Sequence, residues 1–327
     1  MRTVNRSAQL PVVVGVDGSD HSLRALDRAV EEAVLRGAPL QVLCGAPTHR
    51  LAPGAAPGVP GAAREDEGGG GADAAGGADA SARAGSADEE HRRALARQSR
   101  HIAEAAAERA RESAPGLEVM PSAAQENAVA ALVRAGRRAA LTVVGTRGHG
   151  GFTGLLLGSV SLRVAAHIEG PLMVVRGDNE RPRHAVVVGV EYGTDTDAAR
   201  YGFEEAERRA AALLVLHAWE LPVYPGVMVP PPTRMLEEIA EEQARYEESV
   251  PVDAVAGLRE AYPNVDARAE TVYAGPGHAL VEASAAADLV VLAAHRRHRL
   301  FGMRLGPVTH AVLHHAHCPV VLVPTAA

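Results

Sequence analysis

The sequence predicts an α/β protein of two tandem doubly wound domains, each a five-stranded parallel sheet flanked by helices. Short Val-rich runs alternate with longer stretches in which apolar residues recur at helical spacing. These runs do not alternate with polar residues, which is typical of parallel strands buried on both faces. Five strand-like runs and four helical stretches fall in each unit, and 327 residues are enough for two ordinary domains.

The prediction of two domains depends on an internal repeat. The segment PVVVGVDGSDHSLRALDRAVEEA is echoed by HAVVVGVEYGTDTDAARYGFEEA, with Gly15 matching Gly189 at an offset of 174 residues. The segment LTVVGTRGHGG is echoed by LVVLAAHRRHR, and Gly158 beyond it matches Gly306 at an offset of 148 residues. Two constant offsets indicate one duplicated unit with a net 26 extra residues in the first copy.

The first expected domain, residues 1–178, differs from the second, residues 182–327, mainly by an insertion. Residues 46–90 hold 14 Ala, 10 Gly and 4 Pro in 45 positions. Because this composition buries too little apolar surface to offset chain entropy, it predicts a disordered surface loop. A regulatory or partner-binding segment is the alternative interpretation.

Local patterns justify the elements of the first unit. The first helix has Asp20 as its expected N-cap and Gly37 at its end. The helix after the insertion carries charges at i, i+4 spacing, as expected for a solvated face. Strands are expected at residues 12–17, 39–46, 117–123, 141–145 and 171–176, and helices at residues 20–37, 89–113, 126–140 and from about 158.

Composition excludes several classes of function. A net charge of −7 and a pI of about 6.1 argue against a nucleic-acid binder with a broad basic surface. No apolar run approaches the ~20 residues that span a membrane, and the N-terminus lacks a signal-peptide pattern. Cys44 and Cys318 lie in apolar segments and are interpreted as buried thiols of a reducing compartment. We therefore expect a cytoplasmic protein.

A glycine-rich stretch follows the fourth strand. Gly145, Gly148 and Gly158 have the spacing G-x2-G-x9-G, and Ser159 follows directly. Glycines allow a backbone to approach a ligand, and successive loop N–H groups form an anion-binding nest. The helix that starts near Gly158 presents unpaired N–H groups at its positive end. This pattern favours a phosphate chain as ligand, with Arg147 as a charged partner.

Asp17 ends the first strand, at the other side of the expected cleft. Its carboxylate suits ribose hydroxyls or Mg²⁺, and the backbone near Val42 is placed to meet a base edge. The alternative is that Asp17 and Ser19 are only turn and capping residues and the glycines only a loop. The residues alone leave both interpretations open.

The glycine stretch, together with VVVGVDGSDHS near the N-terminus, resembles the universal stress protein family over nearly the whole chain. The resemblance implies a strand order of 3-2-1-4-5 and an adenine nucleotide, ATP or a relative, with or without Mg²⁺. It also implies pairing of the two domains through their last strands, PLMVVR and PVVLVP. The implied nucleotide-site residues are Gly15, Asp17, Gly18, Val42, Gly145, Thr146, Arg147, Gly148, His149, Gly158, Ser159 and Val160.

The second domain departs from this motif. Ala293 and Arg296 replace the first two glycines, Pro307 replaces the serine, and Glu191 replaces the aspartate. Proline also removes one N–H donor from the start of the helix. We interpret this half as a degenerate site and a structural partner. The alternative is an anion site formed by the basic cluster Arg296, Arg297, Arg299 and Arg304.

Other motifs point away from metal binding and catalysis. His310 and His314 have i, i+4 spacing, but histidines near a helix C-terminus are favoured by its dipole, and we expect no metal. Neither a G-x-S-x-G elbow nor a P-loop occurs, so we expect no catalytic residues. The expected function is a nucleotide-dependent regulator in a stress response. A nucleotide-independent scaffold, a slow Mg²⁺-dependent ATP hydrolase and a further homodimer remain alternatives.

Overall fold

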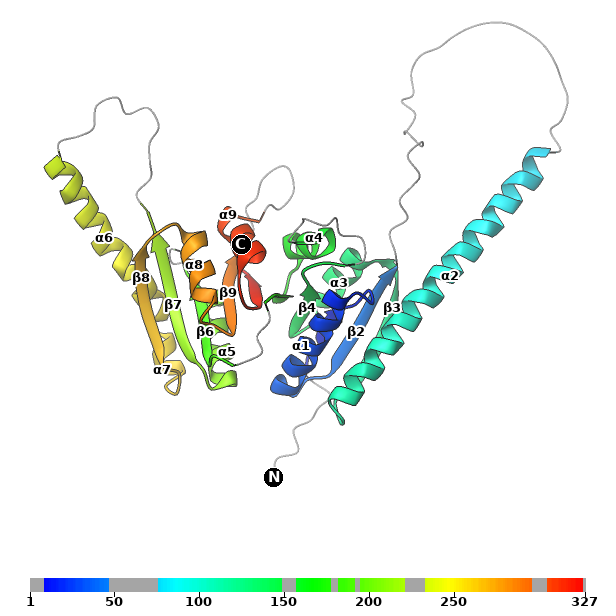
Figure 1. Cartoon of the computed structure of the whole chain (residues 1–327), viewed down its shortest axis with the longest axis horizontal. Helices are drawn as coiled ribbons and strands as arrows, with labels where there is room; N and C mark the ends of the chain where they lie inside the picture. The colour runs from blue at the N-terminus through cyan, green and yellow to red at the C-terminus, as the bar shows by residue number, and fades with distance from the viewer. Residues whose placement is uncertain are drawn as a thin grey trace, which may run out of the picture.

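The structure of the chain is a computed structural model. It describes residues 9–46, 76–148, 157–177, 182–191, 195–220, 233–295 and 305–325. The elements of the first half are β1 (Val12–Gly15), α1 (Asp20–Arg36), β2 (Leu40–Ala46), α2 (Gly76–Ser113), β3 (Val119–Asn127), α3 (Ala128–Gly136), β4 (Leu141–Gly145), α4 (Ser159–His167) and β5 (Leu172–Val175) (Figure 1).

The second half repeats this order with one additional short helix. Its elements are β6 (Ala185–Gly189), α5 (Thr196–Arg209), β7 (Ala212–Trp219), α6 (Thr233–Val255), α7 (Leu258–Ala261), β8 (Ala267–Tyr273), α8 (Pro276–Ser284), β9 (Leu289–Ala294), α9 (Pro307–His315) and β10 (Val320–Pro324). The alternation of strand and helix confirms the predicted α/β class.

The strands form one ten-stranded sheet in the order β3-β2-β1-β4-β5-β10-β9-β6-β7-β8. Within each half all pairings are parallel, and each half has the expected order 3-2-1-4-5. β5 and β10 pair antiparallel, with Val174 opposite Val320 and Leu172 opposite Leu322. In the first half, the strand order reverses between β1 and β4, which is where doubly wound sheets bind ligands.

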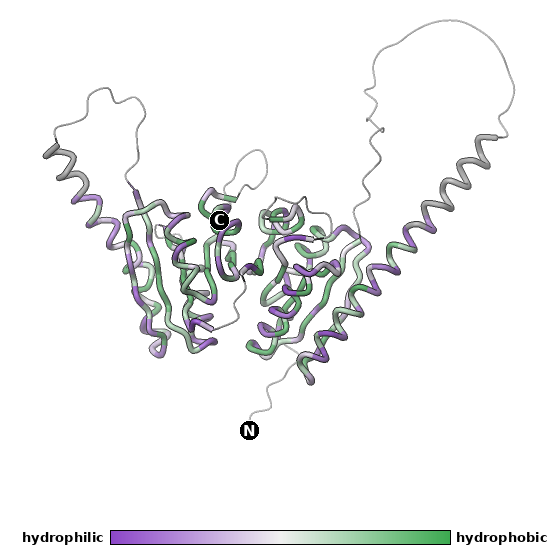
Figure 2. The backbone as a smooth tube through the Cα atoms, in the orientation of Figure 1, coloured by the Kyte–Doolittle hydropathy of each residue, from purple (hydrophilic) through white to green (hydrophobic). Residues whose placement is uncertain are grey.

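The sheet separates two apolar layers. Val12 and Val14 face a core with α1, α2, α5 and α6, whereas Val13 faces a core with α3, α4, α8 and α9. Strands covered on both faces need apolar residues at every position, which explains the uninterrupted Val runs. Figure 2 shows the same pattern, with largely green inner strands and alternating colours along α1, α2 and α6.

Two local predictions are wrong. The disordered loop was predicted to extend over residues 46–90, but its C-terminal part is helical, because α2 begins at Gly76. Alanine has the highest helix propensity, and it is frequent in this segment together with Asp, Glu and Arg. The N-cap of α1 is Ser19 and not Asp20, since the Ser19 side chain accepts a hydrogen bond from Ser22 N. Gly37 ends α1 as predicted, with a φ of 63°.

The described residues include no helix that is long and apolar enough to cross a membrane. Cys44 in β2 and Cys318 before β10 are both buried, as predicted.

Candidate functional site

The candidate site lies at the carboxyl ends of β1 and β4 in the first half. Gly145, the last residue of β4, is buried, and a Cβ there would lie 2.8 Å from the backbone carbon of His21. The missing side chain at Gly145 therefore makes room for the first turn of α1. Gly15, at the end of β1, faces the side chain of Leu132, at 3.0 Å from a Cβ. Both glycines bring helices close to the sheet.

Asp17 connects the end of β1 to the start of α1. Its Oδ1 accepts hydrogen bonds from Ser19 N (3.0 Å) and Ser19 Oγ (2.6 Å). Its own N–H donates to Ser22 Oγ (3.3 Å). Gly18 follows with a φ of 85°, a left-handed conformation that favours glycine. This network fixes the Asp17 carboxylate at the edge of the sheet.

Gly148 lies directly against this carboxylate. Asp17 Oδ2 occupies the space into which a Cβ on Gly148 would project. The structure therefore brings together two residues that are 131 positions apart in the sequence and that were predicted to face one nucleotide. Arg147, the preceding residue, is exposed at the same place.

A backbone hydrogen bond links Thr146 and Gly158, at the two ends of the glycine stretch. Gly158 N donates to the carbonyl of Thr146 (2.6 Å), and Thr146 is 8% exposed. The hydroxyl of Ser161 donates to the carbonyl of Gly145 (2.6 Å). These two bonds fix the first turn of α4 against the end of β4.

The N-terminus of α4 is open to an anion. Gly158 is the N-cap and has no side chain, so the cap residue itself offers no oxygen to the first-turn N–H groups in the described part of the chain. Ser159 and Val160 in this turn are exposed. Unpaired N–H groups and the positive end of the helix dipole together favour a bound phosphate.

His21 belongs to this site although its sequence pattern did not single it out. Its Nδ1 lies 2.6 Å from a guanidinium nitrogen of Arg24 and 3.3 Å from Thr146 Oγ1. The pKa of His21 is lowered below its ordinary value. Burial has the largest effect, and the charges of Arg24 and Arg147 add to it. The site therefore combines a neutral imidazole with two arginines.

One predicted residue, Val42, lies away from this edge. Val42 is fully buried in the middle of β2, where it pairs with Val14 on one side and Pro121 on the other. Its side chain therefore points into the core. His149 lies outside the described residues. The other predicted residues, Gly15, Asp17, Gly18, Gly145, Thr146, Arg147, Gly148, Gly158, Ser159 and Val160, lie at or beside the ends of β1, β4 and the start of α4.

The equivalent region of the second half contains a carboxylate. Glu191 N donates to Asp195 Oδ2 (2.5 Å), just as Asp17 N donates to Ser22 Oγ in the first half. Asp195 is 3% exposed, and its Oδ1 lies 2.9 Å from Nε2 of His295. A carboxylate therefore stands in place of the Ser22 hydroxyl, and it is engaged by Glu191 N and by the contact with His295.

Asp195 also corrects the predicted alignment of the halves. It takes the place of Ser22 at an offset of 173 residues, one fewer than the 174 that separate Gly15 from Gly189. The spacing from the glycine that ends the strand to this position is therefore one residue shorter in the second half. α9 begins at Pro307, so this helix lacks one N–H donor. The basic cluster at residues 296–304 lies outside the described residues.

Groups of side chains suited to metal binding do not occur among the described residues. His310 and His314 stack with ring centroids 4.2 Å apart near the C-terminus of α9. Burial, then the charges of His310 and Arg176, lower the pKa of His314.

The universal stress protein family model matches residues 10–176 and 182–324. A universal stress protein of Mycobacterium tuberculosis is 30% identical over 329 residues, covering 97% of each chain. A universal stress protein of Mycolicibacterium smegmatis is 29% identical over 98% of this chain and 99% of its own. The solved structure of a universal stress protein from Archaeoglobus fulgidus has a TM-score of 0.61 at 13% identity, covering 96% of this chain and 98% of that chain.

Shorter family structures contain adenine nucleotides. A universal stress protein from Archaeoglobus fulgidus was solved in complex with dAMP; it is 21% identical, covers 43% of this chain and 97% of its own, and has a TM-score of 0.29. Another, in complex with cAMP, is 27% identical, covers 52% of this chain and 98% of its own, and has a TM-score of 0.30.

Proposed function

The chain belongs to the universal stress protein family, and from that premise we propose that its first half binds ATP or another adenine nucleotide and acts as a nucleotide-dependent regulator. The observation that most supports this proposal is the contact between Asp17 and Gly148. It joins the end of β1 to the glycine stretch beside an uncapped helix N-terminus. The choice of an adenine nucleotide rests on the family motif G-x2-G-x9-G-S.

The proposed binding mode divides the ligand between two sides of the site. The phosphates bind at the first turn of α4, where N–H groups of Ser159 and Val160 and the guanidinium of Arg147 meet negative charge. Gly148 contributes backbone close to the phosphates, and His149, which lies outside the described residues, is a proposed contact from the motif alone.

Asp17 serves the ribose side. Its carboxylate accepts from ribose hydroxyls or joins the shell of a phosphate-bound Mg²⁺, which needs only one or two carboxylates from a protein. The base lies along the carboxyl end of β2; Val42, in the middle of that strand and paired on both sides, is not part of the proposed contact. We assign no catalytic residue, so the residues named here bind and orient the nucleotide.

The two halves have different roles in this proposal. The first half carries the nucleotide, and the second half, with Asp195 and Pro307 in the equivalent region, is a structural partner. The pairing of β5 with β10 joins the halves within one chain, and a further homodimer is compatible with it. Nucleotide binding stabilises the first half by mass action, which gives the regulator its two states.

The test measures ATP binding to the full chain by calorimetry, with mass spectrometry of any small molecule that copurifies. Gly148→Glu places a carboxylate against Asp17 and the phosphates, and we expect it to weaken binding by at least about 100-fold, which corresponds to ~2.7 kcal/mol. Gly257→Glu is the matched control, because a Cβ at Gly257 meets nothing within 4 Å. We expect the control to bind like the wild type.

Two outcomes contradict the proposal. Equal affinity of the wild type and Gly148→Glu would remove the glycine stretch from the site. Failure of the wild type to bind ATP, ADP, AMP or cAMP at millimolar concentration would leave the interaction scaffold as the better function.

A further inference from the structure

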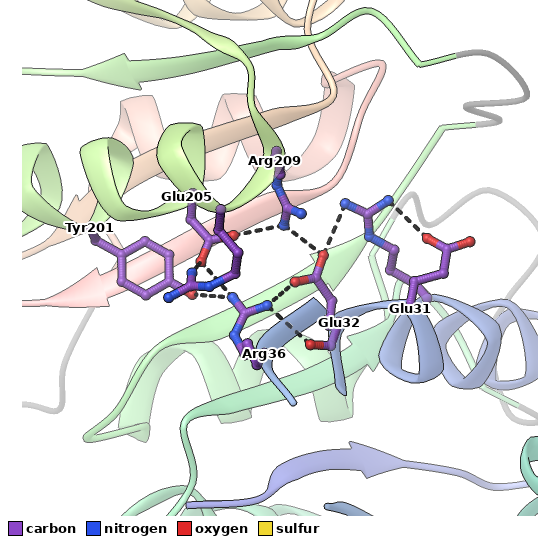
Figure 3. Close-up of polar contacts among 8 residues, drawn as sticks. Glu31, Glu32, Arg36, Tyr201, Glu205 and Arg209 are labelled. Carbon is purple, nitrogen blue, oxygen red and sulfur yellow. Dashed lines mark hydrogen bonds and ion pairs between the residues drawn. The ribbon is translucent and has the colours of Figure 1, made fainter. Parts of the chain in front are cut away.

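A buried cluster of charges joins α1 of the first half to α5 of the second half (Figure 3). Glu32 and Arg36 are 1% and 7% exposed, and Glu205 and Arg209 are 0% and 11% exposed. Side chains of this kind are rarely buried unless they are paired. The nucleotide site and its residues are not involved, so the inference stands independently of the proposed function.

The four side chains form a ring of alternating charge. Arg209 Nη2 lies 2.6 Å from Glu32 Oε1 and 2.7 Å from Glu205 Oε2. Arg36 Nη2 lies 2.6 Å from Glu205 Oε1, and Arg36 Nη1 binds Glu32 Oε2. Each arginine therefore binds one carboxylate on its own helix and one on the other helix. Two of the four contacts cross between the halves.

The ring follows from a stripe that both helices carry. Each helix presents a Glu and, four residues later, an Arg, and Glu32 and Glu205 are 173 residues apart, as are Arg36 and Arg209. The duplicated stripe makes the two faces complementary to each other in an antiparallel sense, Glu to Arg and Arg to Glu. The charge on Glu32 is maintained: burial raises its pKa, but Arg209, Arg28 and Arg36 together lower the pKa below its ordinary value.

The i, i+4 stripes differ at one position, and the helices differ again just before the Arg, where α1 has Leu35 and α5 has Arg208, which contacts Glu205. Four residues before its Glu, α1 has Arg28, whereas α5 has Tyr201. Tyr201 OH accepts a hydrogen bond from Arg36 Nη2 (3.2 Å). Arg28 lies at the outer side of the cluster, 3.0 Å from Glu32 Oε1 and 3.1 Å from Glu31 Oε2. If a second α1 occupied the place of α5, its Arg28 would stand where Tyr201 is and would face Arg36.

We propose that this ring is the element by which the α1 face of the first half recognises the α5 face of the second half, and that Tyr201 determines this choice against a second α1 face. The partner that fits the α1 face is a helix with Tyr, Glu and Arg at successive i, i+4 positions. A neutral hydroxyl at Tyr201 accepts from Arg36, whereas a guanidinium there adds a fourth cation around Glu205, which already contacts Arg36, Arg208 and Arg209.

The first experiment exchanges charges within each helix of the full chain. One variant carries Glu32→Arg with Arg36→Glu, a second carries Glu205→Arg with Arg209→Glu, and a third combines both exchanges. Each exchange keeps the net charge and the i, i+4 pair of its own helix. Either exchange alone sets like charges against each other across the halves, and we expect a fall in Tm of roughly 10 °C.

The combined variant distinguishes recognition from simple helix stabilisation. It restores opposite charges across the halves, so we expect it to recover at least half of the lost Tm. The unrecovered part reflects Arg28 and Arg208, which lie beside the exchanged carboxylates. If the combined variant is as unstable as the sum of the two exchanges, the ring does not mediate recognition and the proposal is overturned.

The second experiment tests Tyr201 with smaller changes. Tyr201→Arg is expected to lower Tm and to increase hydrogen exchange of both α1 and α5. Tyr201→Phe keeps the aromatic side chain and removes only the hydrogen bond from Arg36, so its effects on Tm and hydrogen exchange are expected to be far smaller. Arg28→Tyr added to Tyr201→Arg transposes the two residues and is expected to recover stability. Equal losses for Tyr201→Phe and Tyr201→Arg, or no recovery on transposition, would overturn the role of Tyr201.

Discussion

His295 Nε2 lies 2.9 Å from Oδ1 of the buried Asp195, and this pair stands where the first half has only the hydroxyl of Ser22. The buried Ser22 hydroxyl accepts from Asp17 N and donates to Ser19 O, whereas a carboxylate at the equivalent position only accepts. The pair therefore gives a physical reason why the second half differs from the first, beyond the loss of glycines that the sequence shows.

Replacing Asp195 with Ala is expected to destabilise the second half. Glu191 N would lose its acceptor and His295 would lose its contact with the buried carboxylate, and we expect a cost of about 1 kcal/mol because both groups are partly open to solvent. The fluorescence of Trp219, the single tryptophan of the chain, reports on this half during thermal unfolding. Asp197→Ala, at an exposed position of the same helix, is the control. An unchanged transition for Asp195→Ala would show that the pair contributes nothing.

Gly145→Ala is expected to destabilise the first half through steric overlap. A Cβ at this position meets the backbone of His21, which cannot move without shifting α1, so we expect a loss of about 1–3 kcal/mol. Gly15→Ala should cost less, because the atoms it meets belong to the Leu132 side chain. Urea denaturation of both variants checks the order. A smaller loss for Gly145→Ala than for Gly15→Ala would contradict the packing interpretation.

The pH dependence of stability is expected to involve His21. Its pKa is lowered in the folded state, so the unfolded chain binds the proton more readily than the folded chain. The stabilising effect is complete above the ordinary value of 6.5 and is lost as the pH falls through the lowered pKa. Thermal unfolding between pH 7.5 and pH 5 is compared for the wild type and His21→Gln.

The wild type should lose more stability on acidification than His21→Gln. His314 also has a lowered pKa and acts in the same direction in both proteins, so the difference between the two curves isolates His21. Parallel curves would mean that His21 does not resist protonation in the fold.

Both cysteines are expected to be unreactive in the folded protein. Burial raises the pKa of Cys318 to about 12 and also raises the pKa of Cys44, so little thiolate exists near neutral pH. Alkylation with iodoacetamide, followed by mass spectrometry, should label neither residue before unfolding and both after it. Rapid labelling of either thiol in the native protein would contradict this.

The fold class and most element positions could be predicted from the sequence, because strands such as β1 and β4 are continuous Val-rich runs. The strand order was predicted from the family resemblance. The sequence also placed Asp17 and Gly148 at one site. The role of Asp195 could not be predicted, since its contacts with Glu191 and His295 depend on a shift of one residue between the repeats. The start of α2 was missed because Gly and Ala favour opposite states within the same segment.

The charged ring between α1 and α5 was also beyond prediction. Its i, i+4 pairs look like those of any solvated helix face, and only the antiparallel meeting of β5 and β10 brings the two faces together. One signal in the sequence could have revealed the charged ring. The same charge pattern repeats in both copies of the duplicated unit, at positions on the apolar side of each helix.

The continuity of the ten strands leaves β3 and β8 as the outermost members of the sheet. An edge strand has unpaired backbone groups on one side, which favour addition of another strand and aggregation. In β3, Pro121 withholds an amide from any incoming strand, and in β8 the exposed Arg268 and Glu270 keep the rim charged. Because β5 and β10 pair with each other, the two units together have two edge strands where two separate sheets would have four. The sequence protects the two edge strands that remain.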